Sequence, residues 1–286
     1  MASVAFVVHP ERPEAAKVAL HLVEWLERLG HATWLPLDDA DRLGRAELGR
    51  PDDSLCVGLD LAVSLGGDGT MLRTVALVAE ADVPVVGVNF GQLGYLTDVE
   101  PEGARQAVER FLAGEHRIEQ RMLLAVDVEA ADTRQSDRHL VALNEAVLEK
   151  TASGHTVRLD VDLDGSRFTP YAADGLIVAT PTGSTAYAFS ARGPIVEPTH
   201  RALLLTPVSP HMLFDRTLVL NDDAEVRLTV AGQRSAALVV DGRSIGELQP
   251  GDVVRCRAAE HVARLVTSGP RDFHAILKAK FGLTDR

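Results

Sequence analysis

The chain has 286 residues, which suits one large domain or two smaller ones at roughly 100–200 residues per domain. Apolar residues make up 46% and charged residues 24% of the sequence, as in folded globular proteins, so a disordered or fibrous chain is excluded. The net charge of −12 disfavours a nucleic acid or an anionic membrane surface as the main partner. An acidic protein can still bind phosphate through backbone N–H groups and a few placed cations.

Cysteine content and terminal patterning point to an ordinary intracellular chain. Cys56 and Cys256 are the only cysteines, too few for a disulfide framework or a Cys-rich zinc site. The first eleven residues lack the basic start of a signal peptide, and no stretch approaches the roughly 18–20 apolar residues of a membrane span. We therefore expect a cytoplasmic protein.

The first part of the chain alternates strands and helices. Strands are predicted at Ser3–Val8, His31–Leu35, Leu61–Leu65 and Val83–Val88, and helices at Glu14–Leu29, Met71–Glu80 and Pro101–Ala113. This alternation is typical of a parallel α/β sheet.

From Arg121 onward, short strands are separated by turn signals such as Asp164-Gly165 and Asp241-Gly242. Strands are predicted at Leu123–Val128, Val157–Leu163, Leu176–Ala179, Leu218–Leu220, Val226–Val230, Ala237–Val240 and Val253–Arg257. This pattern favours an all-β, sandwich-like domain. A final helical stretch, Asp272–Phe281, is expected to pack back on the first domain. The predicted domains are therefore residues 1–120, joined by 267–286, and residues 121–266.

The strongest local signal is the loop Gly66-Gly67-Asp68-Gly69-Thr70, which follows a buried strand and opens a helix. Glycines allow the backbone to approach a ligand closely, and N–H groups at a helix start favour a phosphate. A carboxylate beside phosphates is unfavourable unless it binds a metal or takes a proton. The loop therefore suggests phosphoryl transfer, with Asp68 as base or as partner of Mg²⁺. The alternative is a plain strand-to-helix turn.

Two further segments carry polar groups beside predicted strands. The stretch from Asp174 to Tyr187 ends in small hydroxyl residues and an aromatic ring, which suit a sugar or a base edge, or a simple Ser/Thr-rich turn. Asn144 and Glu145 interrupt the apolar run Leu140–Leu148, and a buried Glu needs a partner such as a ribose hydroxyl. The alternative for this pair is a bulge in an edge strand.

Two histidines are weaker candidates. His155 lies in a Gly-flanked loop and could contact a phosphate or a ribose, whereas His211 reads as structural. The remaining histidines show no metal-binding spacing, and the sequence has no Gly-x-Ser-x-Gly of a serine hydrolase. Residue patterns alone thus predict no metal-ligating cluster.

Taken together, these segments resemble the NAD kinase family. The matching stretches stand in the family's order: Gly66–Arg73, Gly87–Asp98, Ala142–Glu145, Asp174–Tyr187 and Leu205–His211. The first stretch alone is shared with diacylglycerol-type lipid kinases and, more loosely, with phosphofructokinases. The stretch Asp174–Tyr187 is specific to the NAD kinases.

The resemblance implies an enzyme that transfers the γ-phosphoryl of ATP to the 2′-hydroxyl of the adenosine ribose of NAD, giving NADP. It implies a divalent ion, Mg²⁺ in the usual case, and some relatives accept polyphosphate. It also implies an α/β nucleotide-binding domain, a β-rich domain that contributes to the dinucleotide site, and a homodimer or homotetramer.

The resemblance implies a role for each residue that matches a functional position of the family. Asp68 matches the general base, Gly66, Gly67, Gly69 and Thr70 match the phosphate-facing loop, and Arg73 matches a basic position near the phosphates. Asn144 and Glu145 match residues that hold ribose hydroxyls, and Asp174 matches a dinucleotide contact. The positions that match a segment lining the dinucleotide site are Thr185, Ala186, Tyr187 and Ser190. His155 falls where a basic residue often contacts the ligand.

The sequence departs from the family pattern at three positions. Arg192 stands where many members have glycine, Ala172 where NAD⁺-preferring members often have a basic residue, and Arg243 where an amide is common. The choice between NAD⁺ and NADH therefore stays open.

Three other functions fit the sequence less well than an NAD kinase. A lipid kinase would need a basic amphipathic stretch, which the sequence lacks. A non-catalytic NAD or NADP sensor would gain little from Asp68, and a phosphofructokinase-like enzyme would need α/β patterning in the second half.

Overall fold

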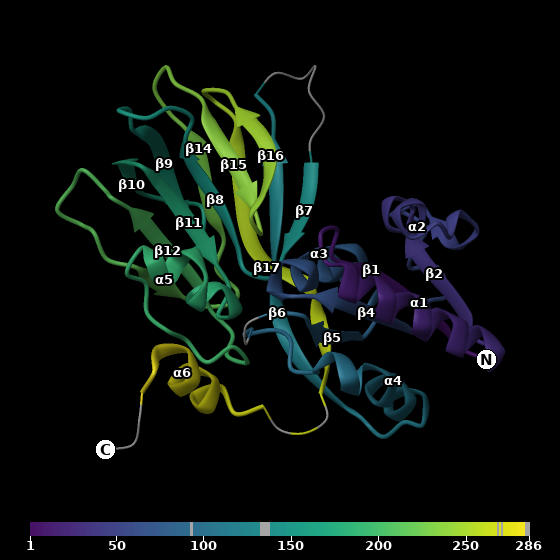
Figure 1. Ribbon diagram of the computed structural model, residues 1–286. Coiled ribbons are helices and arrows are strands. Elements are labelled where there is room, and N and C mark those ends of the chain that lie inside the picture. The colour runs from purple at the N-terminus through teal and green to yellow at the C-terminus, as the bar shows by residue number, and fades with distance from the viewer. Residues whose placement is uncertain (92–93, 132–137, 268, 270, 284–286) are drawn as a thin grey trace. The chain divides into compact units, whose positions relative to one another are not determined.

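The computed structural model describes residues 1–91, 94–131, 138–267, 269 and 271–283. The chain forms two compact units (Figure 1): unit 1 is Met1–Gln120 with His261–Arg286, and unit 2 is Arg121–Glu260. Two long strands, β6 (Arg117–Glu129) and β17 (Val253–Thr267), each begin in one unit and end in the other. Each unit encloses its own hydrophobic core.

Unit 1 is built on a parallel sheet. In spatial order its strands are β3 (Gly49–Arg50), β2 (Ala32–Pro36), β1 (Ser3–Val8), β4 (Leu61–Gly66) and β5 (Val85–Asn89). The end of β17 joins β5 in parallel through the pair Leu265 and Val85. The central strands β1, β4 and β5 are almost continuous apolar runs because both of their faces are covered.

The helices of unit 1 follow the strands as expected. They are α1 (Pro13–Arg28), α2 (Leu37–Leu43), α3 (Asp68–Val78) and α4 (Ala104–Leu112), with 3₁₀ turns η1 (Ala46–Leu48), η2 (Ala79–Ala81) and η3 (Pro101–Gly103). Helix α3 begins three residues before the predicted start, inside the Gly-rich loop. The short α2 was not predicted; its seven residues are too few for a clear helical periodicity, and it ends at Gly44 with φ of 67°.

The strand order creates a switch point between β1 and β4. These neighbours pair in parallel from Val4–Leu61 to Val8–Leu65. Helix α1 leads from β1 toward β2, whereas α3 leads from β4 toward β5 on the other side. In open α/β sheets, ligands bind beyond the carboxyl ends of the strands at such a point.

Unit 2 is an antiparallel sandwich. One sheet has the order β13 (Leu218–Leu220), β12 (Leu203–Val208), β11 (Gly175–Ala179), β8 (Glu145–Lys150), β15 (Ala236–Val240) and β16 (Arg243–Leu248). The facing strands include β10 (Ser166–Ala173), β9 (Val157–Leu163), β14 (Val226–Val230) and the first half of β17, while β6 pairs with β7 (Arg138–Ala142). Alternate residues of both layers, such as Leu148 and Leu159, form one core. The sandwich-like prediction is confirmed.

The alternative considered for Asn144-Glu145, a bulge in an edge strand, is wrong. The apolar run Leu140–Leu148 is not a single strand, because it divides into β7 and β8 around Leu143 and Asn144. Strand β8 pairs with β11 on one side and β15 on the other, so the pair Asn144-Glu145 is not a bulge in an edge strand. Long-range pairing, rather than local sequence, decides where this run breaks.

The C-terminal helix α6 (Phe273–Phe281) belongs to unit 1, as expected. The side chain of Asp272 caps it by accepting from the Ala275 N–H at 2.9 Å. The ring of Phe273 lies 6.4 Å from that of Tyr95. None of the helices in the described part of the chain is long and apolar enough to cross a membrane.

Candidate active site

A cavity of about 230 Å³ opens at the switch point of unit 1. The turn after β1 and the turn after β4 line it together, through Val8, His9, Pro10, Arg12, Gly67, Gly69, Thr70 and Arg73. This is the place that the strand order marks for a ligand.

The glycines of the 66–70 loop serve two purposes. A Cβ at Gly66 would lie 2.1 Å from the Thr70 Oγ1, so this position must be glycine for the turn to close on the helix. A Cβ at Gly67 or Gly69 would meet no protein atom within 4 Å. These two glycines instead leave the backbone bare at the cavity wall, where a ligand can approach it closely.

The electrostatics of this cavity favour an anion. Helix α3 begins at Asp68, and the first N–H groups of a helix have no intrahelical acceptor. Arg12 and Arg73 add two guanidinium groups to the wall. Arg12 also donates to the carbonyl oxygen of Phe90, which ties the β1–α1 turn to the loop after β5.

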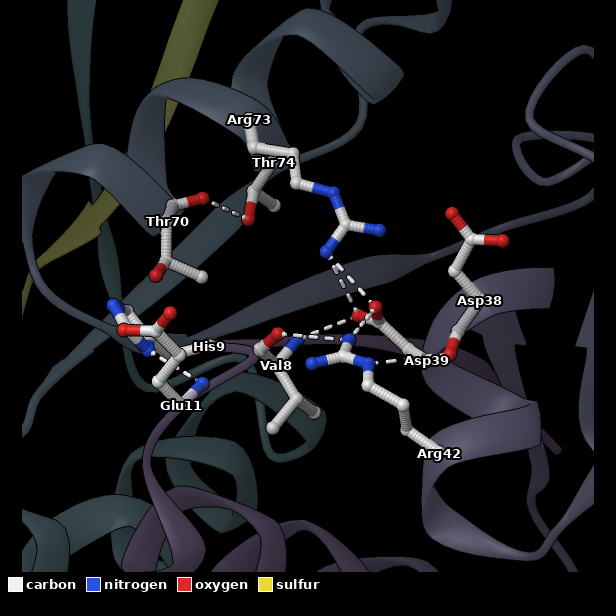
Figure 2. A network of polar contacts seen from close by, with 9 residues as sticks. All are labelled: Val8, His9, Glu11, Asp38, Asp39, Arg42, Thr70, Arg73 and Thr74. Carbon is white, nitrogen blue, oxygen red and sulfur yellow. Dashed lines mark hydrogen bonds and ion pairs between the residues drawn. The ribbon is translucent and has the colours of Figure 1, made fainter.

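Arg73 is held in place by a carboxylate that sequence reasoning missed. Figure 2 shows Arg73 from α3 and Arg42 from α2 converging on Asp39. Asp39 is fully buried, accepts from the Val8 N–H at 2.8 Å, and receives the Arg73 Nη1 at 2.9 Å. A buried carboxylate needs such compensation, and its partners in return acquire a fixed orientation.

Asp68 lies in the chain between Gly67 and Gly69, which line the cavity. Its carboxylate, however, is bound by the loop after β5. The Tyr95 N–H donates to Oδ2 at 2.8 Å and the Leu96 N–H donates to Oδ1 at 3.1 Å. A Cβ at Gly94 would lie 2.2 Å from the same Oδ1, so glycine permits this close approach. A carboxylate offers about four lone-pair positions, so Asp68 can still accept a proton.

In unit 2, Asp241 organises the turn between β7 and β8. Its carboxylate accepts three backbone N–H bonds, from Leu143 at 2.7 Å, Asn144 at 2.8 Å and Glu145 at 3.0 Å. Asp241 itself adopts φ of 47° in the turn after β15. The result is a fixed backbone at the end of the six-stranded sheet, where Asn144 and Glu145 begin β8.

Glu145 is a buried acid with spare hydrogen-bonding capacity. Glu145 is only 7% exposed, and its Oε2 has no hydrogen-bond partner among the described residues. Burial, reinforced by the nearby charge of Asp241, raises the pKa of Glu145 to about 8, although the Tyr187 N–H opposes this shift. Glu145 is therefore mostly protonated near pH 7 and can both donate and accept a hydrogen bond.

The segment after β11 lies against this end of the sheet. It forms η4 (Thr182–Thr185) and the short helix α5 (Tyr187–Ser190). The Thr180 hydroxyl donates to the Leu143 carbonyl at 2.6 Å, which joins the segment to the β7–β8 turn. Burial, and to a smaller extent the charges of Glu149 and Asp174, raise the pKa of the Tyr187 phenol, while Lys150 opposes the shift.

The predicted site residues fall into two groups, one in each unit. Unit 1 brings together Gly66, Gly67, Asp68, Gly69, Thr70 and Arg73. Unit 2 brings together Asn144, Glu145, Thr185, Ala186 and Tyr187, and Asp174 joins them through its charge on the Tyr187 phenol. Asp174 is also ion-paired with Lys150, whose Nζ lies 2.6 Å from its Oδ1.

The two remaining predicted site residues, Ser190 and His155, are both exposed. Ser190 is exposed at the end of α5. His155 is exposed in the loop that follows β8, with no described contact to Glu145 or Tyr187. Gln92 and Leu93, part of the stretch Gly87–Asp98, lie outside the described residues.

Sequence reasoning missed several residues of these sites. They are His9, Pro10, Arg12, Asp39, Lys150 and Asp241. The first three could have been found, because His9-Pro10 directly follows a predicted parallel strand, where ligand-binding loops occur. Asp39, Lys150 and Asp241 give no local signal, since the partners that connect them to the sites lie 24 or more residues away in the sequence.

Comparisons with known proteins match both parts of the chain. Residues 49–116 match the family model of the ATP-NAD kinase N-terminal domain, and residues 143–268 match that of the ATP-NAD kinase C-terminal domain. The NAD kinase of Heliobacterium modesticaldum is 42% identical over 281 residues, covering 98% of each chain. The NAD kinase of Citrifermentans bemidjiense is 38% identical over 290 residues, covering 100% of both.

Solved structures show the same architecture. Yeast NADH kinase, solved in complex with NADH, superposes with a TM-score of 0.90 at 25% identity, covering 100% of this chain and 89% of its own. The NAD kinase of Archaeoglobus fulgidus, solved in complex with ATP, shares the fold with a TM-score of 0.71 at 24% identity, covering 98% of this chain and 97% of its own. With both domains matched and relatives aligned along the full length, the chain belongs to the NAD kinase family.

Proposed function

We propose that this protein transfers the γ-phosphoryl of ATP to the 2′-hydroxyl of the adenosine ribose of NAD, giving NADP. The cavity at the switch point of unit 1 carries the proposal. It combines a helix start, two bare glycines, Arg12 and Arg73 beside a carboxylate, Asp68. Phosphoryl transfer mainly needs alignment and charge neutralisation, which these groups supply.

Unit 1 supplies the groups that bind the phosphates of the donor, and it also supplies the base. The N–H groups at the start of α3 and the guanidinium of Arg73 bind phosphate oxygens. Asp68 accepts the proton of the 2′-hydroxyl as the ribose oxygen bonds to phosphorus and the bond from phosphorus to the leaving ADP oxygen breaks. General-base catalysis of this kind typically contributes about 10²–10⁴-fold.

Unit 2 supplies the groups that bind the ribose of the acceptor. Asn144 stands on the turn that Asp241 fixes, and Glu145 keeps an unpaired carboxyl oxygen within the described residues. Ribose hydroxyls are both donors and acceptors, and a mostly protonated Glu145 matches them in both respects. Tyr187, an exposed residue, offers its ring as a stacking surface for the dinucleotide.

Mg²⁺ would bind together with the nucleotide. Among the described residues, no group of three or more His, Cys, Asp or Glu side chains comes together to form a metal cage. Mg²⁺ is commonly held by substrate phosphates with one or two carboxylates, and Asp68 is placed beside the phosphate cavity to be one of them. The ion would neutralise the charge of the triphosphate there.

The proposal also covers the location of the enzyme, its oligomeric state and its further substrates. We place it in the cytoplasm as a homodimer or homotetramer, with NADH and polyphosphate as further substrates to be tested. Light scattering of the purified protein distinguishes the two assemblies from a monomer.

A coupled assay tests the reaction. Purified protein is incubated with Mg-ATP and NAD⁺, and NADP is measured with an NADP-specific dehydrogenase, while parallel reactions contain NADH or polyphosphate. The proposal predicts NADP that depends on ATP. Folded protein that binds NAD without forming NADP in any reaction would indicate a sensor, and protein that does not bind NAD at all would reopen the lipid-kinase reading.

A further inference from the structure

The C-terminal segment of the chain contacts the loop that holds Asp68. This segment comprises Arg271 and helix α6, and the loop comprises residues 94–98. Both belong to unit 1. Three separate contacts join them, one at each end of α6 and one from the residue just before its cap.

The first contact is a buried cation. The side chain of Arg271 is only 7% exposed, with its guanidinium 3.6 Å from Asp98 and 3.9 Å from Glu119. Its three guanidinium nitrogens make no hydrogen bond among the described residues, so the attraction is between charges at slightly longer range. A cation buried this deeply is retained only where paired carboxylates compensate it, and here one of them, Asp98, is part of the loop.

The second and third contacts enclose Tyr95. Phe273, buried at the start of α6, lies 6.4 Å from the Tyr95 ring in a tilted arrangement. Lys280, one residue before the end of α6, places its ammonium 4.2 Å from the centre of the same ring. Aromatic pairs and cation–π contacts of this geometry are both stabilising.

Tyr95 and Leu96 are also the two residues whose N–H groups bind the Asp68 carboxylate, at 2.8 and 3.1 Å. We propose that Arg271, Phe273 and Lys280 are positioning residues for catalysis: they clamp the 94–98 loop so that its backbone N–H groups fix the orientation of Asp68. The inference rests on the proposed function, in which Asp68 is the base, but assigns a role to the C-terminal segment that the reaction itself does not require.

The clamp supplies rigidity where the loop needs it. Downstream, the loop is tied to β5 because the Val99 N–H donates to the Gly87 carbonyl at 3.2 Å and the Asn89 N–H donates to the Val99 carbonyl at 2.8 Å. Tyr95 lies four residues before this anchor, and its contacts with α6 are with side chains rather than with a strand. A base that must meet a hydroxyl loses rate steeply when it is displaced, by about 10²-fold for roughly 1 Å.

The test combines surface and core variants with a background that lacks the base. Lys280→Met removes the cation above Tyr95, and Phe273→Ala removes the ring contact. Lys280→Arg keeps a cation at the same place, and Lys278→Met removes the same charge from the same helix. Each change is made in the wild-type chain and in Asp68→Asn, and kcat and KM are measured together with hydrogen exchange of the 94–98 segment.

If the clamp positions Asp68, Lys280→Met lowers kcat roughly two- to fivefold and Phe273→Ala about tenfold, with KM for ATP nearly unchanged. Lys280→Arg restores kcat and Lys278→Met leaves it unaltered. Exchange of the Tyr95 and Leu96 amides becomes faster, while exchange in β1 does not. In the Asp68→Asn background the same changes lower kcat less than about twofold, since no base remains to be positioned.

An equal loss of kcat in both backgrounds would overturn the proposal, because it would show a general effect on folding. Unchanged kcat and unchanged amide exchange in Lys280→Met and Phe273→Ala would overturn it as well. Near-normal turnover of Asp68→Asn alone would instead contradict the part of the proposed function in which Asp68 is the base, and the exchange measurement would then show separately whether the clamp on the loop exists.

Discussion

Each unit contains an aspartate that holds other residues of its site in place, and the two are compensated in different ways. Asp39 in unit 1 is fully buried and receives two guanidinium groups, from Arg42 and Arg73, besides the Val8 N–H. Asp241 in unit 2 receives three backbone N–H groups, with only a weaker attraction from Arg243. One aspartate therefore fixes cations, and the other fixes a backbone turn.

The difference matches the ligand that the proposed function assigns to each unit. In unit 1, the pairing leaves Arg73 oriented at the wall of an anion-binding cavity, despite a net charge of −12 on the whole protein. In unit 2, burial and, second to it, the nearby charge of Asp241 raise the pKa of Glu145 to about 8. The first arrangement suits phosphates, and the second suits hydroxyl groups that both donate and accept.

The largest expected effect concerns the pH dependence of stability, and it arises from Glu145. Its pKa is raised from 4.5 to about 8 in the folded chain, so between these values the folded state binds a proton that the unfolded state has lost. Stability therefore falls as pH rises from about 4.5 to 8, by about 5 kcal/mol in total. Glu145→Gln removes this loss and makes the variant more stable than wild type above pH 8.

Urea unfolding of both proteins at pH 6 and pH 9 measures the effect. The stability difference between Glu145→Gln and wild type should grow with pH. Glu149→Gln, on the same face of β8, is the matched control and should not change the slope. Parallel pH profiles for wild type and Glu145→Gln would contradict the raised pKa of Glu145, and with it the effect of Asp241 on this residue.

The next effect is the loss of the buried carboxylate in unit 1. Asp39→Ala leaves Arg42, Arg73 and the Val8 N–H without their acceptor, which should lower the free energy of unfolding by about 3 kcal/mol. The two guanidinium groups are partly exposed, so water limits the loss. Urea unfolding gives the value, and a loss under about 1 kcal/mol would mean that Asp39 does not organise this region.

A smaller effect separates the two arginines that share Asp39. Only Arg73 of the pair is among the residues described at the cavity wall. Arg73→Met should raise KM for ATP roughly tenfold or more through the loss of a charge-assisted hydrogen bond to phosphate. Arg42→Met is the matched control, with a comparable loss of stability but a KM within about twofold of wild type. Equal rises in KM would place the phosphate site elsewhere.

The smallest effect concerns Arg192, which follows α5 with φ of 67°. A residue with a Cβ is strained there, whereas glycine is not, so Arg192→Gly should stabilise the protein by about 1 kcal/mol. Arg192→Ala removes the side chain but keeps the strain and should change stability little. Thermal unfolding of the three proteins decides, and equal shifts for both variants would point to the arginine side chain rather than to the backbone.

Local patterns were enough to predict much of this molecule. The β1–α1–β2 and β4–α3–β5 units follow from buried apolar runs, helical periodicity and the glycines that end them. The loop around Asp68 was recognised because three glycines and a carboxylate between a strand and a helix have few purely structural explanations. Boundaries that depend on local signals, such as those of β9 and β14, match the prediction residue by residue.

What the sequence could not reveal depends on contacts between distant positions. Asp241 binds amides that lie 96 to 98 residues earlier, and Asp39 binds a guanidinium 34 residues later. The break between β7 and β8 is set by pairing with β11 and β15, which come later in the chain. No periodicity in a single sequence encodes such partners, so these residues became visible only in the folded chain.

The most direct test of the account is the turnover of Asp68→Asn with Mg-ATP and NAD⁺. The amide cannot take the proton of the 2′-hydroxyl and keeps only one acceptor oxygen for the Tyr95 and Leu96 N–H groups. We predict that kcat falls by about 10² or more while NAD and ATP still bind and the protein remains folded. Turnover close to that of the wild type would contradict the assignment of Asp68 as the base.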